Sequence, residues 1–187
     1  MLFVALVHFP TMNKEGRVVT TSVTNFDIHD IARASRTYGV ARYFIVTPIE
    51  LQQQFTRRII THWVEGSGAE YNPSRKEALT GVEVVGDLAA AGESIERDFG
   101  TPTTWIATSA KHYPNTITCQ ELRRRLHETD ENFCLIFGTG YGLHTQILDE
   151  VDLILEPING PTPFNHLSVR SAVSIYLDRL LAVRTEE

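Results

Sequence analysis

Short apolar runs alternate with longer segments of helical spacing along most of the chain. Six runs have the length of a strand and are apolar at consecutive positions. They lie at 2–7, 43–46, 82–85, 103–108, 133–137 and 151–155. Strands with two apolar faces, separated by helices, are typical of a parallel sheet that is covered on both sides. The pattern therefore predicts an α/β fold with a mainly parallel six-stranded sheet and helices on both faces.

Several of the intervening segments carry helix-capping residues. Thr24 followed by Asp27 forms a capping pattern at the start of a helix, and Gly39 is placed to end that helix. A second helix is predicted over about 48–63, with an apolar side toward the core. Its apolar positions are Leu51, Phe55, Ile59 and Ile60. Further helices are expected at 87–98, 118–128, 141–149 and 165–183.

A polar segment at about 65–80 interrupts this alternation. It starts with two glycines around Ser67 and belongs to no predicted strand, so we expect an insertion or a lid. Tyr71, Arg75 and Lys76 bring an aromatic ring and two cations together in it. A flexible basic loop can attract nucleic acid that an acidic surface repels, although a solvated loop is the simpler interpretation. Because no repeat or linker divides residues 1–187, we expect a single domain.

The composition limits the classes of function. The 187 residues carry a formal net charge of −6 at pH 7, which excludes binding of nucleic acid over the whole surface but allows a local basic patch. The two cysteines match neither a disulfide framework nor a metal site, and the histidines lack metal-ligand spacing. The chain begins without a leader pattern, and no apolar run reaches the roughly 20 residues that span a membrane. We therefore expect a cytoplasmic protein without a bound metal.

Three glycines follow the strand predicted at 133–137. Gly138, Gly140 and Gly142 stand before a helix, in an arrangement where backbone N–H groups without partners can meet a ligand. Ligands of open α/β sheets bind at the carboxyl ends of strands. Since the spacing matches neither a Rossmann nor a P-loop fingerprint, a tight turn without a ligand is an equal alternative on this pattern alone.

A proline-rich loop follows the strand predicted at 151–155. Three prolines and a glycine stiffen residues 156–166, which lowers the entropy that ligand binding has to remove. The helix behind the loop is expected to begin at Asn165, whose side chain is suited to cap it. Together, this loop and the glycine turn predict a small-molecule pocket.

Three segments resemble the motifs of the SPOUT methyltransferases, in the order of that superfamily. The helix with Arg33 and Gly39 is similar to the first motif, the glycine turn to the second, and residues 165–172 to the third. The similarity covers most of the chain from 24 to 181. The chain as a whole, including 71–79, is most similar to a small bacterial group named for the C-terminal domain of tRNA guanine-N1 methyltransferase-like proteins.

The resemblance implies a trefoil-knotted SPOUT domain that forms a homodimer and binds S-adenosylmethionine within the knot. In the SpoU-like branch, a glycine of the second motif, an isoleucine before the third and a leucine inside it contact the cofactor. Gly138, Ile158 and Leu167 occupy these places. The expected cofactor-site residues are Thr108, Gly138, Thr139, Gly140, Gly142, Leu143, Ile158, Asn165 and Leu167.

The candidates for catalysis come from the first and third motifs, and each has a simpler alternative. Arg33 matches the arginine that contacts RNA phosphate or the reacting nucleotide, a role that suits a guanidinium; the alternative is a solvated helix position. Ser168 could hydrogen-bond the methyl acceptor or only cap the helix. His166 could accept a proton at neutral pH or be an ordinary first-turn histidine. Arg170 could place positive charge beside the pocket or form an ion pair at a dimer interface.

The resemblance implies methyl transfer from S-adenosylmethionine to a nucleotide of structured RNA, either tRNA or rRNA, with Arg33, Arg75 and Lys76 contacting that RNA. Two departures favour a base over the ribose as acceptor: Asp27 replaces the usual asparagine, and the glutamate common in the SpoU-like second motif is missing. The main alternative is a cofactor-binding protein of the same fold without independent methyltransferase activity. An unrelated α/β nucleotide-binding protein is a third possibility.

Overall fold

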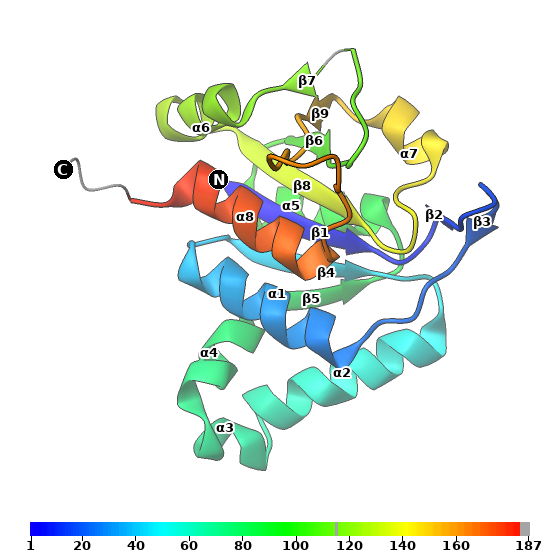
Figure 1. Ribbon diagram of the computed structural model, residues 1–187. Coiled ribbons are helices and arrows are strands. Elements are labelled where there is room, and N and C mark those ends of the chain that lie inside the picture. The colour runs from blue at the N-terminus through cyan, green and yellow to red at the C-terminus, as the bar shows by residue number, and fades with distance from the viewer. Residues whose placement is uncertain (115, 184–187) are drawn as a thin grey trace.

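A seven-stranded parallel sheet forms the centre of the protein (Figure 1). The computed structural model describes residues 1–114 and 116–183. The strand order is β5-β4-β1-β8-β6-β9-β7, and every pair in this sheet is parallel. The strands are β1 (Leu2–Val7), β4 (Arg42–Val46), β5 (Val82–Val85), β6 (Thr103–Ala107), β7 (Thr116–Ile117), β8 (Asn132–Gly138) and β9 (Leu153–Leu155).

The α/β class and the parallel sheet are confirmed, but the predicted strand count is wrong by one. The additional strand, β7, has two residues, which is too short for a recognisable pattern. A separate two-stranded hairpin, β2 (Thr11–Met12) and β3 (Val18–Val19), was not predicted either.

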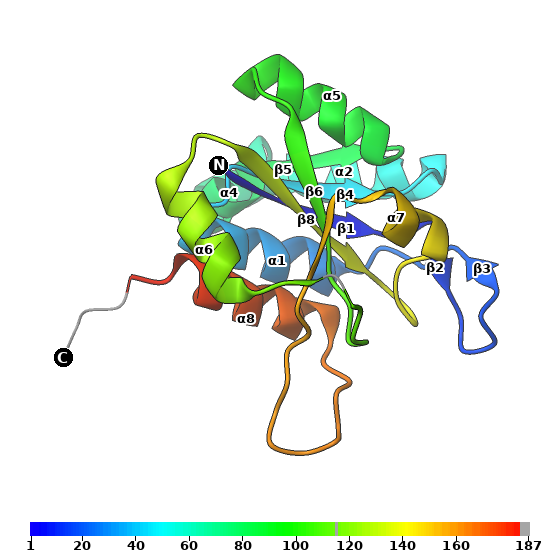
Figure 2. The same cartoon turned by 90° about the horizontal axis from the view of Figure 1, so that it is seen from above.

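Helices cover both faces of the sheet, as expected. Core side chains of α1, α4, α6 and α8 pack on one face, and those of α5 and α7 pack on the other; Figure 2 shows the two layers on opposite sides of the strands. The helices are α1 (Asn25–Thr37), α2 (Glu50–Val64), α3 (Ser67–Tyr71), α4 (Pro73–Thr80), α5 (Leu88–Phe99), α6 (Cys119–Glu128), α7 (Thr145–Glu150) and α8 (Val169–Leu181). Among the described helices, none combines the length and apolar character needed to cross a membrane.

The predicted capping of α1 is confirmed. Thr24 accepts a hydrogen bond from the Asp27 N–H at 3.2 Å, and the Asp27 carboxylate accepts one from the Thr24 N–H at 3.3 Å. These are the two reciprocal bonds of a capping box. At the other end, Gly39 has a φ of 71°, a conformation that side chains disfavour and that stops the helix.

The predicted buried side of α2 is wrong in its first half. Leu51 is 76% exposed and Phe55 is 55% exposed. The polar side chains of Gln52 and Gln53 face the protein instead, because they bond backbone groups of two loops: Gln52 accepts from the Val23 N–H at 2.8 Å, and Gln53 donates to the Thr47 carbonyl at 2.7 Å. Backbone groups at the ends of strands need such partners.

The polar segment at 65–80 is helical, so the expectation of a flexible loop is wrong. It forms α3 and α4, and Asn72 caps α4 by accepting a hydrogen bond from the Arg75 N–H at 3.0 Å. Leu79 of α4 is fully buried in the core cluster that includes α1. Whether these helices act as a lid stays a prediction.

Candidate functional site

The segments that were expected to form a pocket leave the sheet at one edge. Because β1, β8, β6 and β9 run parallel, their carboxyl ends share this edge. The glycine turn follows β8, the loop with Thr108 follows β6, and the proline-rich loop follows β9. This is the edge at which open α/β sheets bind their ligands.

The glycine turn is closely packed around Gly138. A Cβ atom on Gly138 would lie 2.6 Å from the Leu143 nitrogen and 2.8 Å from the Gly142 carbonyl carbon, so no side chain fits there. Gly140 and Gly142 have φ values of 61° and 108°, which favour glycine. The helix predicted at 141–149 begins later than expected. Because the φ angles of Gly140 and Gly142 are not helical, α7 starts only at Thr145.

The hairpin of β2 and β3 is hydrogen-bonded to this turn through backbone groups. The Tyr141 N–H donates to the Met12 carbonyl at 3.0 Å, and the Met12 N–H donates to the Gly142 carbonyl at 3.0 Å. The Gly142 N–H donates to the Thr139 carbonyl at 3.1 Å. The expectation of unpartnered N–H groups is therefore wrong for Tyr141 and Gly142. These three backbone hydrogen bonds hold the turn in one conformation, a property that favours ligand binding where a ligand site exists.

Thr108 and Asn165 hold neighbouring loops in place. Thr108 is buried, and both its N–H and its hydroxyl donate to the Ile136 carbonyl, at 3.0 and 2.9 Å. The Asn165 side chain donates to the Ala110 carbonyl at 3.0 Å, which ties the proline-rich loop to the loop after β6. Asn165 is not the cap of α8, contrary to the prediction. Ser168 caps that helix by accepting from the Ser171 N–H at 3.2 Å.

Ile158 and Leu167 lie at the two ends of the proline-rich loop. Ile158 is half-buried and packs against the core, whereas Leu167 is 45% exposed. The loop is anchored where the Tyr176 hydroxyl donates to the Glu156 carbonyl at 2.8 Å. Leu167 thus presents an apolar surface that nothing in the described part of the chain fully covers, which suits a ligand contact.

The three candidates for catalysis are exposed, and they lie on α1 and just before α8. Arg33 lies in the third turn of α1. His166 lies in the loop before α8, with its ring edge-on to Phe164 at a centroid distance of 5.3 Å. Ser168 lines an open groove together with Asp30 and residues of α8. The structure therefore brings Ser168 near Asp30 of the first motif.

Arg170 forms ion pairs within its own chain. Its guanidinium lies 3.0 Å from the Asp27 Oδ1 and 3.4 Å from the Asp30 Oδ2. Asp27 is almost completely buried, and it also closes the capping box of α1. The aspartate that replaces the usual asparagine of the first motif therefore joins the starts of α1 and α8, and the hypothesis of a dimer-interface ion pair is not needed to explain Arg170.

Asp27→Asn is expected to lower the free energy of unfolding by about 1 to 2 kcal/mol, because the amide keeps the cap but loses the charged hydrogen bond to Arg170. Urea unfolding monitored by circular dichroism measures this difference. Asp149→Asn, on the exposed side of α7, is the matched control and should stay within about 0.5 kcal/mol of the wild type. Equal stability of the two variants would show that the Asp27 ion pair contributes nothing.

His8 is a buried polar residue at this edge that sequence reasoning missed. It follows β1 directly, is fully buried, and its Nδ1 lies 2.9 Å from the Thr21 hydroxyl. Burial lowers the pKa of His8 to about 4, although the negative charge of Asp27 opposes this shift. The only signal in the sequence is a histidine at the carboxyl end of an apolar strand, where functional groups of α/β proteins gather.

The low pKa of His8 makes stability depend on pH. The histidine takes up a proton near pH 6.5 in the unfolded chain but near pH 4 in the folded one, so acidification between these values favours unfolding. The loss from this group should reach about 3 kcal/mol near pH 4. Urea unfolding at several pH values measures it, and His8→Asn, which does not titrate, should have the shallower pH dependence. Parallel pH profiles for both proteins would contradict the assignment.

Of the three expected RNA contacts, Arg33 lies on α1, and Arg75 and Lys76 lie on α4. The Arg75 guanidinium stacks over the Trp63 ring, 4.3 Å from its centroid, and Arg75 is half-buried. Lys76 and Tyr71 are exposed, the latter by 86%. The two predicted cations therefore have different surroundings, and Lys76 is the freer of the two.

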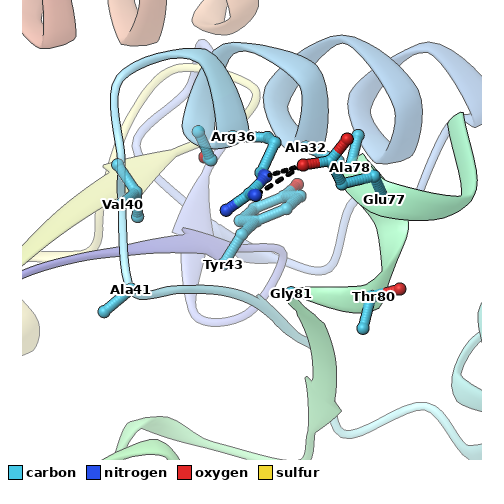
Figure 3. A pocket seen from close by; sticks show the side chains of 10 residues that line it. Ala32, Arg36, Val40, Ala41, Tyr43, Glu77, Ala78, Thr80 and Gly81 are labelled. Atoms are coloured by element: carbon cyan, nitrogen blue, oxygen red, sulfur yellow. Dashed lines mark hydrogen bonds and ion pairs between the residues drawn. The ribbon is translucent and has the colours of Figure 1, made fainter. Parts of the chain in front are cut away.

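A cavity of about 320 Å³ lies elsewhere, between α1, α4 and the amino ends of β4 and β5 (Figure 3). The ion pair between Arg36 and Glu77 stands beside the ring of Tyr43 at this cavity. None of the predicted site residues lines it. Since parallel strands place their ligand sites at the carboxyl ends, this cavity is separate from the candidate site.

Known sequences are similar to this chain over nearly its whole length. A family described as SAM-dependent RNA methyltransferase matches residues 1–182. A protein of Aquifex aeolicus is 40% identical over 181 residues, which are 97% of this chain and 88% of that protein. A tRNA (guanine-N(1)-)-methyltransferase of Nitratidesulfovibrio vulgaris is 43% identical over 180 residues, or 96% of this chain. The chain spans only 42% of the length of that methyltransferase.

Solved structures of low sequence identity share the fold. TrmJ from Z. mobilis superposes with a TM-score of 0.62 at 17% identity, covering 100% of this chain and 71% of that one. The SpoU methyltransferase AviRb from Streptomyces viridochromogenes, in complex with the cofactor AdoMet, superposes with a TM-score of 0.55 at 13% identity, covering 97% of this chain and 56% of that one. The arrangement of strands and helices is thus that of SpoU-type methyltransferases.

Proposed function

Because the chain belongs to the family of S-adenosylmethionine-dependent RNA methyltransferases, we propose that it methylates a nucleotide of structured RNA, with tRNA as the substrate class. The observation that carries this proposal is the closed glycine turn at the carboxyl edge of the sheet, inside a chain that the family matches over residues 1–182. Two relatives are named tRNA (guanine-N(1)-)-methyltransferase, which supports tRNA over rRNA and a guanine base over a ribose.

The residues of this edge fit the cofactor. Gly138 lets the backbone of the turn close tightly, because a Cβ there would meet Leu143 and Gly142. Gly140 is exposed in the same turn, and Leu167 offers an apolar surface. We propose that these residues hold S-adenosylmethionine together with the rest of the expected set: Thr108, Thr139, Gly142, Leu143, Ile158 and Asn165. When bound, this cofactor supplies an electrophilic methyl group on a sulfonium, and no metal is needed for its transfer.

We assign the handling of the acceptor nucleotide to Arg33, Ser168 and His166. All three are exposed, so RNA can reach them. Arg33 would bind a phosphate or the reacting nucleotide in a bidentate fork. Ser168 and His166 would donate to or accept from the base, which positions it for an in-line attack.

A homodimer belongs to the same proposal. Two exposed aromatic residues, Phe26 at 68% on α1 and Phe164 at 72% in the loop before α8, offer an apolar surface for a second copy. The acceptor residues of one subunit would then face the cofactor of the other. The trefoil knot, the contacts of Arg75 and Lys76 with RNA, and the cytoplasmic location that a tRNA substrate requires belong to the same proposal.

Two measurements on the purified chain test the proposal. Calorimetric titration with S-adenosylmethionine and with its demethylated product should give binding, whereas ATP and NAD should not bind. Incubation with unmodified bulk tRNA and radiolabelled cofactor should then transfer label to the RNA, and nucleoside mass spectrometry should find it in methylguanosine. Binding without transfer would favour the alternative of a cofactor-binding protein that does not methylate on its own. A chain that binds ATP or NAD and ignores S-adenosylmethionine would overturn the proposal.

A further inference from the structure

A chain of hydrogen bonds joins His8 to the glycine turn. The Thr139 hydroxyl donates to the Val7 carbonyl at 3.0 Å, and it also lies 2.5 Å from the Thr21 hydroxyl, which lies 2.9 Å from the His8 Nδ1. A carbonyl oxygen can only accept, so the Thr139 proton is committed to Val7. Thr21 must then donate to Thr139, and His8 must donate to Thr21. This order of donors sets the tautomer: the proton of the neutral imidazole is on Nδ1.

The other ring nitrogen of His8 is buried without a hydrogen-bond partner. With the proton on Nδ1, Nε2 is an acceptor, and no described residue donates to it. An unpartnered buried acceptor costs stability, and an apolar side chain of similar size would avoid that cost. The polar contribution of the His8 imidazole therefore comes from Nδ1, whose bond to Thr21 is its one hydrogen bond to a described side chain.

Thr21 is the point at which this chain meets the turn. Its hydroxyl bonds Thr139, and its methyl carbon lies 3.4 Å from where a Cβ of Gly140 would be. The Thr21 N–H also donates to the His8 carbonyl at 2.9 Å, so the two residues hold each other through backbone and side chain. Thr139 stands between Gly138 and Gly140. The chain of hydrogen bonds from His8 therefore ends between two glycines of the turn.

We propose that His8 is a positioning residue of the cofactor site, which holds the glycine turn in its ligand-ready conformation through Thr21 and Thr139. This inference rests on the proposed function for the identity of the ligand, S-adenosylmethionine. His8 does not touch the ligand; it acts through the donor on Nδ1. A side chain that keeps a donor at this position should therefore preserve the site, and one that removes it should not.

Three variants separate this role from simple packing. His8→Asn keeps an N–H donor near the position of Nδ1 and should bind S-adenosylmethionine within about twofold of the wild type. His8→Leu removes the donor and Thr21→Val removes the link; each should weaken binding about tenfold, and the double variant should be no weaker than either. Thr37→Val, which removes a threonine hydroxyl from the far end of α1, is the matched control and should bind normally.

The results for these variants can be told apart from a failure of the proposed function, because they compare each variant with the wild type. Affinity that is equal in His8→Leu and the wild type, or equally reduced in His8→Leu and His8→Asn, would overturn the positioning role, whatever the melting temperatures. If the wild type does not bind S-adenosylmethionine at all, the proposed function fails. Hydrogen exchange still tests the relay, which is the chain of hydrogen bonds from His8 through Thr21 to Thr139. The Tyr141 and Gly142 amides should then exchange faster in His8→Leu but not in His8→Asn, and unchanged exchange in both would contradict the relay.

Discussion

Gly138→Ala is expected to weaken S-adenosylmethionine binding by about 1000-fold or more, which corresponds to about 4 kcal/mol. The added methyl group would meet two backbone atoms of the same turn, the Leu143 nitrogen at 2.6 Å and the Gly142 carbonyl carbon at 2.8 Å. Backbone atoms cannot rotate away as a flexible side chain can, so the turn has to open and the wall of the pocket moves. Isothermal titration calorimetry on the folded variant measures the loss.

Gly81→Ala is the matched control for this substitution. A Cβ at Gly81 meets no atom within 4 Å, and this residue lies at the amino end of β5, opposite the proposed site. The control should bind the cofactor like the wild type. Wild-type affinity in Gly138→Ala, with its fold intact by circular dichroism, would show that the ligand does not use the glycine turn.

Arg33→Ala is expected to leave cofactor affinity unchanged and to reduce methyl transfer by about 100- to 1000-fold, the usual cost of removing one electrostatic contact to a reacting group. Arg33 is exposed, and its side chain makes no ion pair with any described residue. A loss of activity would therefore not come from a broken internal contact. Single-turnover transfer to tRNA at saturating cofactor measures the effect.

Arg36→Ala on the same helix serves as the comparison. Arg36 is also exposed, but it pairs with Glu77 on α4, beside the cavity at the opposite end of the sheet. Its loss should cost little activity, because a surface ion pair contributes about 1 kcal/mol or less. Full activity in Arg33→Ala would return Arg33 to the interpretation of a solvated helix residue.

Much of the fold could be predicted from the chain because its strands are apolar on both faces and its helix caps are local. The capping box of Thr24 and Asp27 spans four residues, so the sequence alone reveals it. The exposed positions of Leu51 and Phe55 could not be predicted, since they depend on which distant backbone groups Gln52 and Gln53 satisfy. Tertiary contacts override periodicity at such places.

The candidate site divides in the same way. The glycine turn and its place after a strand were predicted, and the family match confirms the resemblance to RNA methyltransferases. Three contacts of the site join residues that lie far apart in sequence. They are the backbone hydrogen bonds of Met12 to the turn, the ion pair of Asp27 with Arg170, and the relay from His8 to Thr139. No local pattern encodes such pairs.

The central pairing of the sheet also affects how the chain folds as it is made. Residues 2–7 of β1 pair with residues 133–138 of β8, and both strands are almost entirely buried. At synthesis rates of about 5 to 20 residues per second, roughly 7 to 26 seconds pass between the two strands. During that time β1 has β4 on one side and an open apolar edge on the other. The domain is therefore expected to fold late in translation, and chaperone binding to the nascent chain should be strongest before β8 is complete.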